Sequence, residues 1–254
     1  MGIVEVNKDF YNKLYRRKNP AISILHSLIS FDQQSKSKIN IKVIKGFFKE
    51  KFLKDLVVLD YGFGHGSLLL KYRRNHELYG CDISEEAVYN FPVVASFIGR
   101  KVLTATVDDY FSKYKDVCFD IITLSHIIEH VDDDFLLVNS LKTKLSDSGI
   151  MLINVPINEV WQDPKHVRKY SADSIKELAD KCNLEIQSIL EVDKLTSFFL
   201  IEEKVKNAGI FKLYTIKIAR LFFAVTPLTI TQVFERLFLK GHQMQQLIVL
   251  ATAK

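Results

Sequence analysis

The chain has 254 residues, of which 48% are apolar and 26% are charged, and its net charge is +5. These values suit one large α/β domain with a small additional cap, and they exclude a disordered or fibrous protein. The charge is uneven, because residues 1–54 hold 12 Lys or Arg against 4 Asp or Glu, a balance of +8 that leaves −3 for the rest. Such a basic segment could meet nucleic acid, anionic lipid or a phosphorylated substrate, but we expect a solvated helical surface.

Three features of the sequence indicate a cytoplasmic protein. No stretch reaches the roughly 18 uninterrupted apolar residues of a membrane-spanning helix. Residues 1–9 have no apolar core of the signal-peptide kind. The cysteines are odd in number and far apart, with no Cys-x-x-Cys pair: Cys81, Cys118 and Cys182. We therefore expect reduced thiols and no structural zinc.

The predicted elements begin with helices and continue as alternating strands and helices. Residues 8–54 are expected to be helical, with a break at Pro20 and a second amphipathic helix from Ile39 to Phe52. The expected strands are Val57–Asp60, Leu78–Asp82, Val102–Val107, Phe119–Leu124, Gly149–Val155, Leu184–Val192 and Gln245–Ala253. The expected helices between them are Ser67–Arg74, one starting at Ser84, Asp133–Leu145 with Ser148-Gly149 as its stop, and Ser171–Cys182. This alternation predicts a parallel sheet that is covered on both faces.

An insert at residues 195–240 interrupts the alternation before the last strand. It is rich in phenylalanine and basic residues, and Pro227 divides it into two helical pieces. We expect a helical lid whose aromatic side chains pack on the core, while a lid over an apolar acceptor or a surface that touches a membrane remains open. The predicted domains are an N-terminal helical cap (1–54), an α/β domain (55–194 plus 241–254) and the helical lid or substrate insert (195–240).

A glycine-rich turn follows the first strand. Asp60 ends an apolar run and is followed by Gly62, Gly64 and Gly66, and Asp82 ends the second strand 22 residues later. Glycine permits positive φ and close approach of a ligand. An acid at the first turn would repel a pyrophosphate, and the Walker Lys-Ser/Thr ending is absent. An acid on the second strand can accept both ribose hydroxyls. The pattern therefore predicts a nucleoside ligand without phosphates and with a cationic end.

At these motifs the sequence resembles the class I S-adenosylmethionine-dependent methyltransferases. Val58–Gly66 and Gly80–Ser84 look like the first two motifs of the family. Phe119–Ile122, followed by Ser125–Val131, is similar to its fourth strand and its Glu-His-Val ending. His166–Ser171 looks like a segment of the small-molecule and sugar methyltransferase branch. Phe63 departs from the family, which usually has a small residue or Cys there, and is expected to narrow the floor of the pocket.

The resemblance implies a Rossmann-like, doubly wound seven-stranded sheet, mostly parallel with an antiparallel last strand. It also implies S-adenosylmethionine as cofactor, with these binding residues: Asp60, Tyr61, Gly62, Gly64, Asp82, Ile83, Asp108, Asp109, Ser125 and His126. In the family's arrangement, the residues at positions 60 and 62 approach the methionine end and the residue at 82 holds the ribose. The residue at 83 packs on adenine, one of 108 and 109 accepts from the adenine amine, and the residue at 125 lies near the sulfonium.

Two histidines are the candidate catalytic residues. His130 and His166 could act as general base or orient the acceptor, because imidazole titrates near neutral pH. His65 is expected to face solvent, and for Tyr11 and Tyr15 core packing is preferred to closure over the cofactor. The run His126–His130 also matches a short zinc-peptidase pattern, His-x-x-Glu-His, but the glycine-rich turn would then have no purpose. No metal site is predicted.

The sequence therefore predicts an S-adenosylmethionine-dependent methyltransferase that is metal-independent. The expected acceptor is an oxygen or nitrogen of a small molecule, a sugar or an intermediate of glycan biosynthesis. A lipid or quinone methyltransferase with an apolar lid is one alternative, and a non-catalytic cofactor-binding module that partners another protein is a second. Nucleic acid is not expected as a substrate, since no appended RNA-binding domain is visible. Peripheral membrane contact and the oligomeric state stay open.

Overall fold

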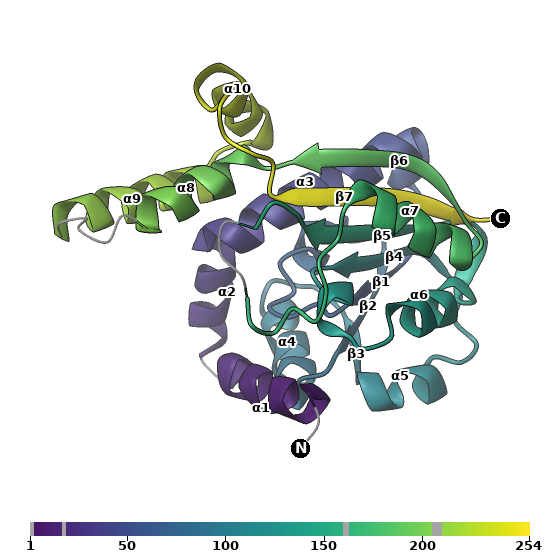
Figure 1. The fold of residues 1–254 in the computed structure, drawn as a ribbon. Coiled ribbons are helices and arrows are strands. Elements are labelled where there is room, and N and C mark those ends of the chain that lie inside the picture. The colour runs from purple at the N-terminus through teal and green to yellow at the C-terminus, as the bar shows by residue number, and fades with distance from the viewer. Residues whose placement is uncertain (1–2, 17–18, 160–162, 205–209) are drawn as a thin grey trace.

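The computed structural model describes residues 3–16, 19–159, 163–204 and 210–254, and it is built around one seven-stranded sheet (Figure 1). The strands are β1 Val57–Tyr61, β2 Glu77–Asp82, β3 Leu103–Thr106, β4 Phe119–Ser125, β5 Leu145–Pro156, β6 Leu184–Val192 and β7 Gln246–Ala253. Their order is β3-β2-β1-β4-β5-β7-β6. β7 runs antiparallel to β5 and β6, and the other pairs are parallel. The predicted Rossmann-like fold is confirmed.

Helices cover both faces of this sheet. They are α1 Ile3–Tyr15, α2 Pro20–Ile29, α3 Phe31–Phe48, α4 Glu85–Phe97, α5 Val107–Lys113, α6 Asp134–Lys142 and α7 Ala172–Lys181. Short 3-10 segments also occur, at Lys49–Leu53 (η1), Leu69–Lys71 (η2) and Ile128–His130 (η3). Alternate residues of β1 face opposite layers, so that Val58 packs with α3 and α4 and Leu59 packs with α6 and α7. The core is therefore two apolar layers separated by the sheet.

Side-chain caps fix the starts of several helices as the sequence predicts. The Ser84 hydroxyl accepts from the backbone N–H of Ala87, and the Ser171 hydroxyl accepts from that of Ser174. Asp133 accepts from the N–H of Leu136 at the start of α6. These bonds satisfy helix-terminal donors that have no partner within the helix.

Several predicted boundaries are wrong for identifiable physical reasons. The helix expected at Ser67–Arg74 is only η2. Leu69 at its start and Tyr72 directly after it are both buried, at the three-residue spacing of a 3-10 turn. The strand expected to reach Val107 ends at Thr106, whose hydroxyl caps the unpredicted helix α5. α3 begins at Phe31 rather than at Ile39.

The signal read as a helix stop at Ser148-Gly149 belongs to an irregularity inside β5. Leu145 already pairs with Phe119, and the register between β4 and β5 shifts before Ile121. A Cβ atom on Gly149 would lie 2.7 Å from the carbonyl oxygen of Phe119. Glycine is therefore needed for close backbone approach at a bulge, and α6 ends earlier, at Lys142.

The described residues of the insert are mostly helical, in α8 Lys194–Lys204, α9 Ile210–Val225 and α10 Leu228–Phe238, and Pro227 separates the last two as expected. The insert rests on α3, where Lys38 donates to the carbonyls of Ala224 and Thr226 and Asp32 pairs with Arg220. Figure 1 shows α8 and α9 extending away from the sheet beside α3. No helix in the described ranges is long and apolar enough to cross a membrane. All three cysteines are free, as predicted.

A separate apolar cluster holds the insert in place. Its buried members are Phe31, Leu195, Phe199, Ile216, Ala224 and Leu239. Phe31 and Phe199 meet edge to face with their ring centroids 5.0 Å apart. The buried aromatic side chains of the insert thus pack on one another and on the start of α3.

We predict that Phe199→Ala loosens the insert without disrupting the sheet. Removing a fully buried aromatic ring costs about 3–5 kcal/mol, and here the loss falls on the contacts of α8 with α3 and α9. Hydrogen exchange should rise in α8 and α9 and stay unchanged in β1 and β4. Phe222→Ala is the matched control, because that ring is 57% exposed and its removal should change little. Equal effects of the two substitutions would contradict this prediction.

Candidate active site

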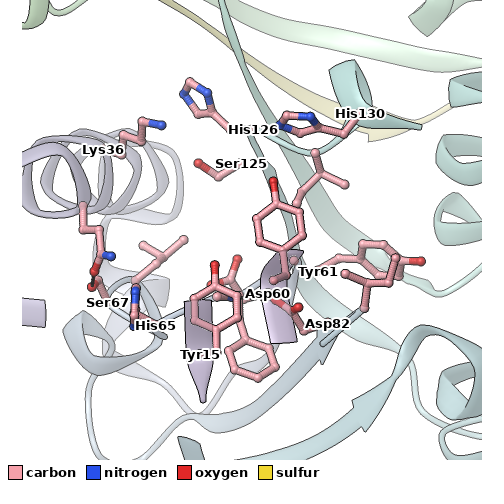
Figure 2. Close-up of a pocket in the computed structure, with 18 of the residues that line it drawn as sticks. Tyr15, Lys36, Asp60, Tyr61, His65, Ser67, Asp82, Ser125, His126 and His130 are labelled. Carbon is pink, nitrogen blue, oxygen red and sulfur yellow. Dashed lines mark hydrogen bonds between the residues drawn. The ribbon is translucent and has the colours of Figure 1, made fainter. Parts of the chain in front are cut away.

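A cavity of about 580 Å³ lies at the carboxyl ends of β1, β2 and β4 (Figure 2). This is the point at which the strand order reverses around β1, where open α/β sheets bind ligands. Ten of the twelve residues predicted for the site line it: Asp60, Tyr61, Gly62, Gly64, Asp82, Ile83, Ser125, His126, His130 and His166. The other two, Asp108 and Asp109, are exposed in the first turn of α5, and Val107 lines the cavity instead.

The glycine-rich turn after β1 packs closely against neighbouring side chains. Gly62 has φ +79°, and a Cβ atom there would lie 1.9 Å from a carbon of Ile127. Gly64 has φ +53°, and a Cβ atom there would lie 2.7 Å from the Tyr15 hydroxyl. Phe63 lies beneath the turn, against Gly80 and Phe91, and lines the cavity as expected. Any other residue at position 62 would therefore be strained and would also displace the segment after β4.

Two buried carboxyl groups stand at the ends of β1 and β2. Asp60 is 4% exposed and accepts a hydrogen bond of 2.6 Å from the Thr123 hydroxyl, and burial raises its pKa to about 7. Asp82 is equally buried, and its oxygens accept from the N–H groups of Gly64 (2.8 Å) and Ser84 (2.9 Å). Burial still raises the pKa of Asp82 to about 6. Both groups would gain from a cation or from hydroxyl donors brought by a ligand.

The N-terminal helices form the opposite wall of the cavity. Tyr15 packs against the core, as expected, but it and Tyr11 also line the cavity, with ring centroids 6.0 Å apart. His65 is half-buried, lines the cavity and meets Tyr15 edge to face at 4.7 Å, so the expectation that it faces solvent is wrong. The turn is too tightly covered by α1 for this side chain to point outward.

A group of imidazoles lies beyond the end of β4. His126 has φ +57°, a conformation rare outside glycine, and its backbone N–H donates to the backbone carbonyl of Asn154. Its Nδ1 lies 3.3 Å from the Glu129 carboxylate, and burial lowers the pKa of His126. His130 and His166 meet with ring centroids 4.7 Å apart. The predicted catalytic pair, 36 positions apart in sequence, is thus brought together.

The zinc-peptidase alternative does not fit this geometry. That pattern needs two histidines four residues apart on one face of an α-helix. Here Ile128–His130 is a single 3-10 turn, and His126 precedes it with positive φ.

Sequence reasoning missed the contribution of α3. Four of its polar side chains line the cavity: Gln33, Lys36, Ser37 and Asn40. Burial lowers the pKa of the Lys36 ammonium. Asn40 donates to the Ser125 hydroxyl (3.1 Å) and accepts from Asn154 (2.9 Å). These residues recur at helical spacing beside the apolar face of α3, and such a polar stripe could have indicated a wall of a binding site.

Comparison with known proteins gives the class of the chain. The model of a family described as a methyltransferase domain matches residues 31–189, more than half of the chain. The chain therefore belongs to this family and is an S-adenosylmethionine-dependent methyltransferase. No curated protein sequence matches it significantly.

Solved structures share the fold at low sequence identity. Magnesium protoporphyrin IX methyltransferase from Synechocystis, with bound S-adenosylhomocysteine, is 12% identical with a TM-score of 0.59, over 98% of this chain and 99% of that one. The (4+2)-cyclase SpnF is 16% identical with a TM-score of 0.58, over 94% and 97%. Coclaurine N-methyltransferase is 15% identical with a TM-score of 0.52, over 83% and 70%. At these identities the likeness shows the fold alone.

The cavity fits the methyl donor of this class. Its two buried carboxyl groups, Asp60 and Asp82, accept hydrogen bonds from a hydroxyl and from backbone N–H groups. None of these donors, all in the described part of the chain, is a cationic side chain. S-adenosylmethionine carries a sulfonium and an ammonium group, as well as two ribose hydroxyls. The glycine turn leaves room for a ligand where a Cβ would intrude.

We predict that Asp60→Asn stabilises the ligand-free protein above neutral pH. The pKa of Asp60 rises from about 4 in the unfolded chain to about 7 in the folded protein. Between these values the folded state holds a proton that the unfolded chain has lost, so its stability falls as pH rises. Asn keeps the bond from Thr123 without this loss and should add about 1–3 kcal/mol at pH 8.

Urea unfolding of both proteins at pH 5 and pH 8 measures this effect. The free energy of unfolding should fall less between the two pH values in Asp60→Asn than in the natural protein. Identical pH dependence would show that Asp60 is not a desolvated acid.

Proposed function

We propose that this methyltransferase acts on an oxygen or nitrogen of a polar small molecule, and that a sugar or an intermediate of glycan biosynthesis is the acceptor. The observation that carries the proposal is the pairing of His130 and His166 at a polar part of the cavity, beside Asp132 and Asp163. In Figure 2, Lys36, His126 and His130 lie above the carboxyl groups of Asp60 and Asp82. The resemblance of His166–Ser171 to the sugar branch supports the finer assignment.

We assign the part of the cavity around Asp60 and Asp82 to the cofactor. Asp82 would accept from the ribose hydroxyls and Ile83 would pack on adenine. Asp60 and the turn at Gly62 would meet the methionine end, and Ser125 would lie near the sulfonium. Tyr61, Gly64 and His126 complete the walls. Asp108 and Asp109 do not line the cavity, so one of these side chains would have to turn inward from the first turn of α5 to reach the adenine amine. The cofactor supplies an electrophilic methyl group, so the protein mainly has to align the acceptor and exclude water.

The two histidines are suited to receive or orient the acceptor's proton. Nδ1 of His130 lies 3.2 Å from the carbonyl of Lys165, so it carries the proton and donates it there. Nδ1 of His166 lies 3.0 Å from the Glu159 carboxylate and does the same. In the neutral form of each ring, Nε2 would then carry a lone pair that can accept a proton. Burial lowers the pKa of His130, which favours the neutral form that can accept a proton.

The apolar-acceptor alternative has less support from the cavity wall. Among the described residues of the insert, none lines the cavity, and its buried aromatic rings pack on one another and on Phe31. Outward-facing side chains of α9 and α10, such as Ile218 and Phe238, are nevertheless well exposed. A lipid or quinone acceptor, with contact between the insert and a membrane, is thus the second candidate. A cytoplasmic location is part of the proposal, in keeping with the free thiols.

We predict that His166→Ala lowers turnover about 100-fold or more, the usual contribution of a general base. The affinity for S-adenosylmethionine should change less than about threefold, because His166 is not among the hydrogen-bond partners of Asp60 and Asp82, the acids assigned to the cofactor. An acceptor screen by release of S-adenosylhomocysteine should begin with nucleotide sugars and continue with polar amines, phenols and quinones. His242→Ala, outside the cavity, is the control and should retain full turnover.

Turnover only on quinones or lipids would replace the sugar assignment by the second candidate. Cofactor binding with no turnover on any acceptor would support a non-catalytic module, as would a His166→Ala variant with full biological function.

A further inference from the structure

We propose that Glu129, His130 and His166 form a binding site for one divalent metal ion of the zinc type. One ligand atom from each residue lies within 4.8 Å of the other two. His130 and His166 line the cavity, so the site opens onto it. Two imidazoles and a carboxylate from three separate positions are a ligand set that first-row transition metals favour. The site is additional to the cofactor-binding part of the cavity.

The state of Glu129 is the first observation in favour. Its side chain is 0% exposed, yet neither carboxylate oxygen accepts a well-aligned hydrogen bond from any group in the described ranges. Two imidazole nitrogens approach it, Nδ1 of His126 at 3.3 Å and Nε2 of His130 at 4.0 Å. A buried carboxylate with poorly satisfied oxygens is costly, and in native proteins such a group is paired, hydrogen-bonded or bound to metal. A cation between Glu129 and His130 would satisfy it.

The orientation of the histidines is the second observation. Each ring uses Nδ1 for a bond to an oxygen, that of the Lys165 carbonyl for His130 and that of the Glu159 carboxylate for His166. In a neutral ring this arrangement puts the lone pair on Nε2, and it also fixes the ring. Metal-binding histidines are held in this way, with one nitrogen on the ion and the other donating to a carbonyl or carboxylate. The two rings thus have the tautomer that a metal site needs.

The ligand atoms of the three residues need only small local shifts to reach the spacing of a metal site. Ligand atoms about 2.0–2.2 Å from a tetrahedral zinc ion lie about 3.3–3.6 Å apart. The 4.0 Å between Nε2 of His130 and the Glu129 oxygen is close to this value. The 4.8 Å limit of the cluster leaves at most about 1.5 Å between ligand atoms to be closed. His166 belongs to the segment after β5 and is only partly buried, so its side chain can approach.

The surrounding charges also favour a cation. Glu159 and Asp163 lie on the same segment as His166, and Asp163 and Asp132 line the cavity. Lys36, on α3, is the opposing cation and lies nearer His126. Lys165, next to His166, is a second ammonium group and pairs with Asp163 at 3.5 Å. The four acidic groups at the cluster and around it, Glu129, Asp132, Glu159 and Asp163, still outnumber these two ammonium groups.

Three protein ligands would leave a coordination position toward the cavity. If the proposed methyl transfer to oxygen is right, an acceptor hydroxyl would bind there. The ion would lower the hydroxyl pKa, so that its proton passes to solvent water and the electron pair stays on the oxygen. The histidines would then act by holding the ion, and the acceptor class would be hydroxyl compounds rather than amines.

Metal binding can be tested directly, whatever the acceptor. Chelator-treated protein is titrated with Zn²⁺ by calorimetry and with Co²⁺ by visible absorption, which reports the ligand set. We expect one ion per chain with a dissociation constant of micromolar or below, weakened at least 30-fold in Glu129→Gln and in His166→Ala. His242→Ala removes a histidine that lies outside the cavity, and this control should bind metal as the natural protein does. So should Asp60→Asn, in the cofactor part of the cavity.

His166→Ala keeps the test valid if Glu129→Gln fails to fold, since His166 is a partly buried cavity residue. Absence of binding at 100 μM Zn²⁺, or binding that both cluster variants retain, would overturn the site. Metal binding without any methyl transfer would leave it standing and count only against the proposed function. Methyl transfer by protein that binds no metal would overturn the metal site and leave the proposed function standing.

Discussion

The burial of Asp60 and Asp82 at the carboxyl ends of β1 and β2 is the constraint on which the site depends. The sheet order reverses at β1, so both carboxyl groups reach one crevice, and the close cover of α1 and α3 keeps water from solvating them. The ligand-free protein therefore holds two desolvated acids at some cost in stability. A cationic cofactor removes this cost when it binds, and the free energy recovered adds to its affinity. The buried acids therefore lower the stability of the ligand-free protein and strengthen cofactor binding.

A chain of buried polar contacts joins the parts that were predicted as separate domains. Asn40 on α3 bonds to Ser125 at the end of β4 and to Asn154 on β5. Asn154 donates to Gln246 on β7, which in turn donates to Asp193 at the start of the insert. The N-terminal helices, the sheet and the insert thus share one network next to the cavity. A substitution in α3 or at the base of the insert is expected to reach the site through it.

Local signals predicted the parts of the fold that depend on them. β6 has the predicted bounds, and the caps at Ser84 and Ser171 act as expected. The glycine turn and Asp82 likewise lie at the cavity. The bulge at Gly149 was misread, because glycine marks both a helix end and a close backbone approach. The contacts of Lys36 with the cavity and of Glu129 with His130 and His166 were missed, because they depend on tertiary packing between distant segments.

The most direct test of the account is to count the protons released when S-adenosylmethionine binds. Calorimetric titrations at pH 6.5 in buffers of different ionisation enthalpy give that number. With the pKa of Asp60 at about 7 and that of Asp82 at about 6, the cation should displace about one proton in total. Asp60→Asn should lose most of this release and bind more weakly. Binding without proton release, at an affinity unchanged in Asp60→Asn, would contradict the claim that buried acids hold the cofactor.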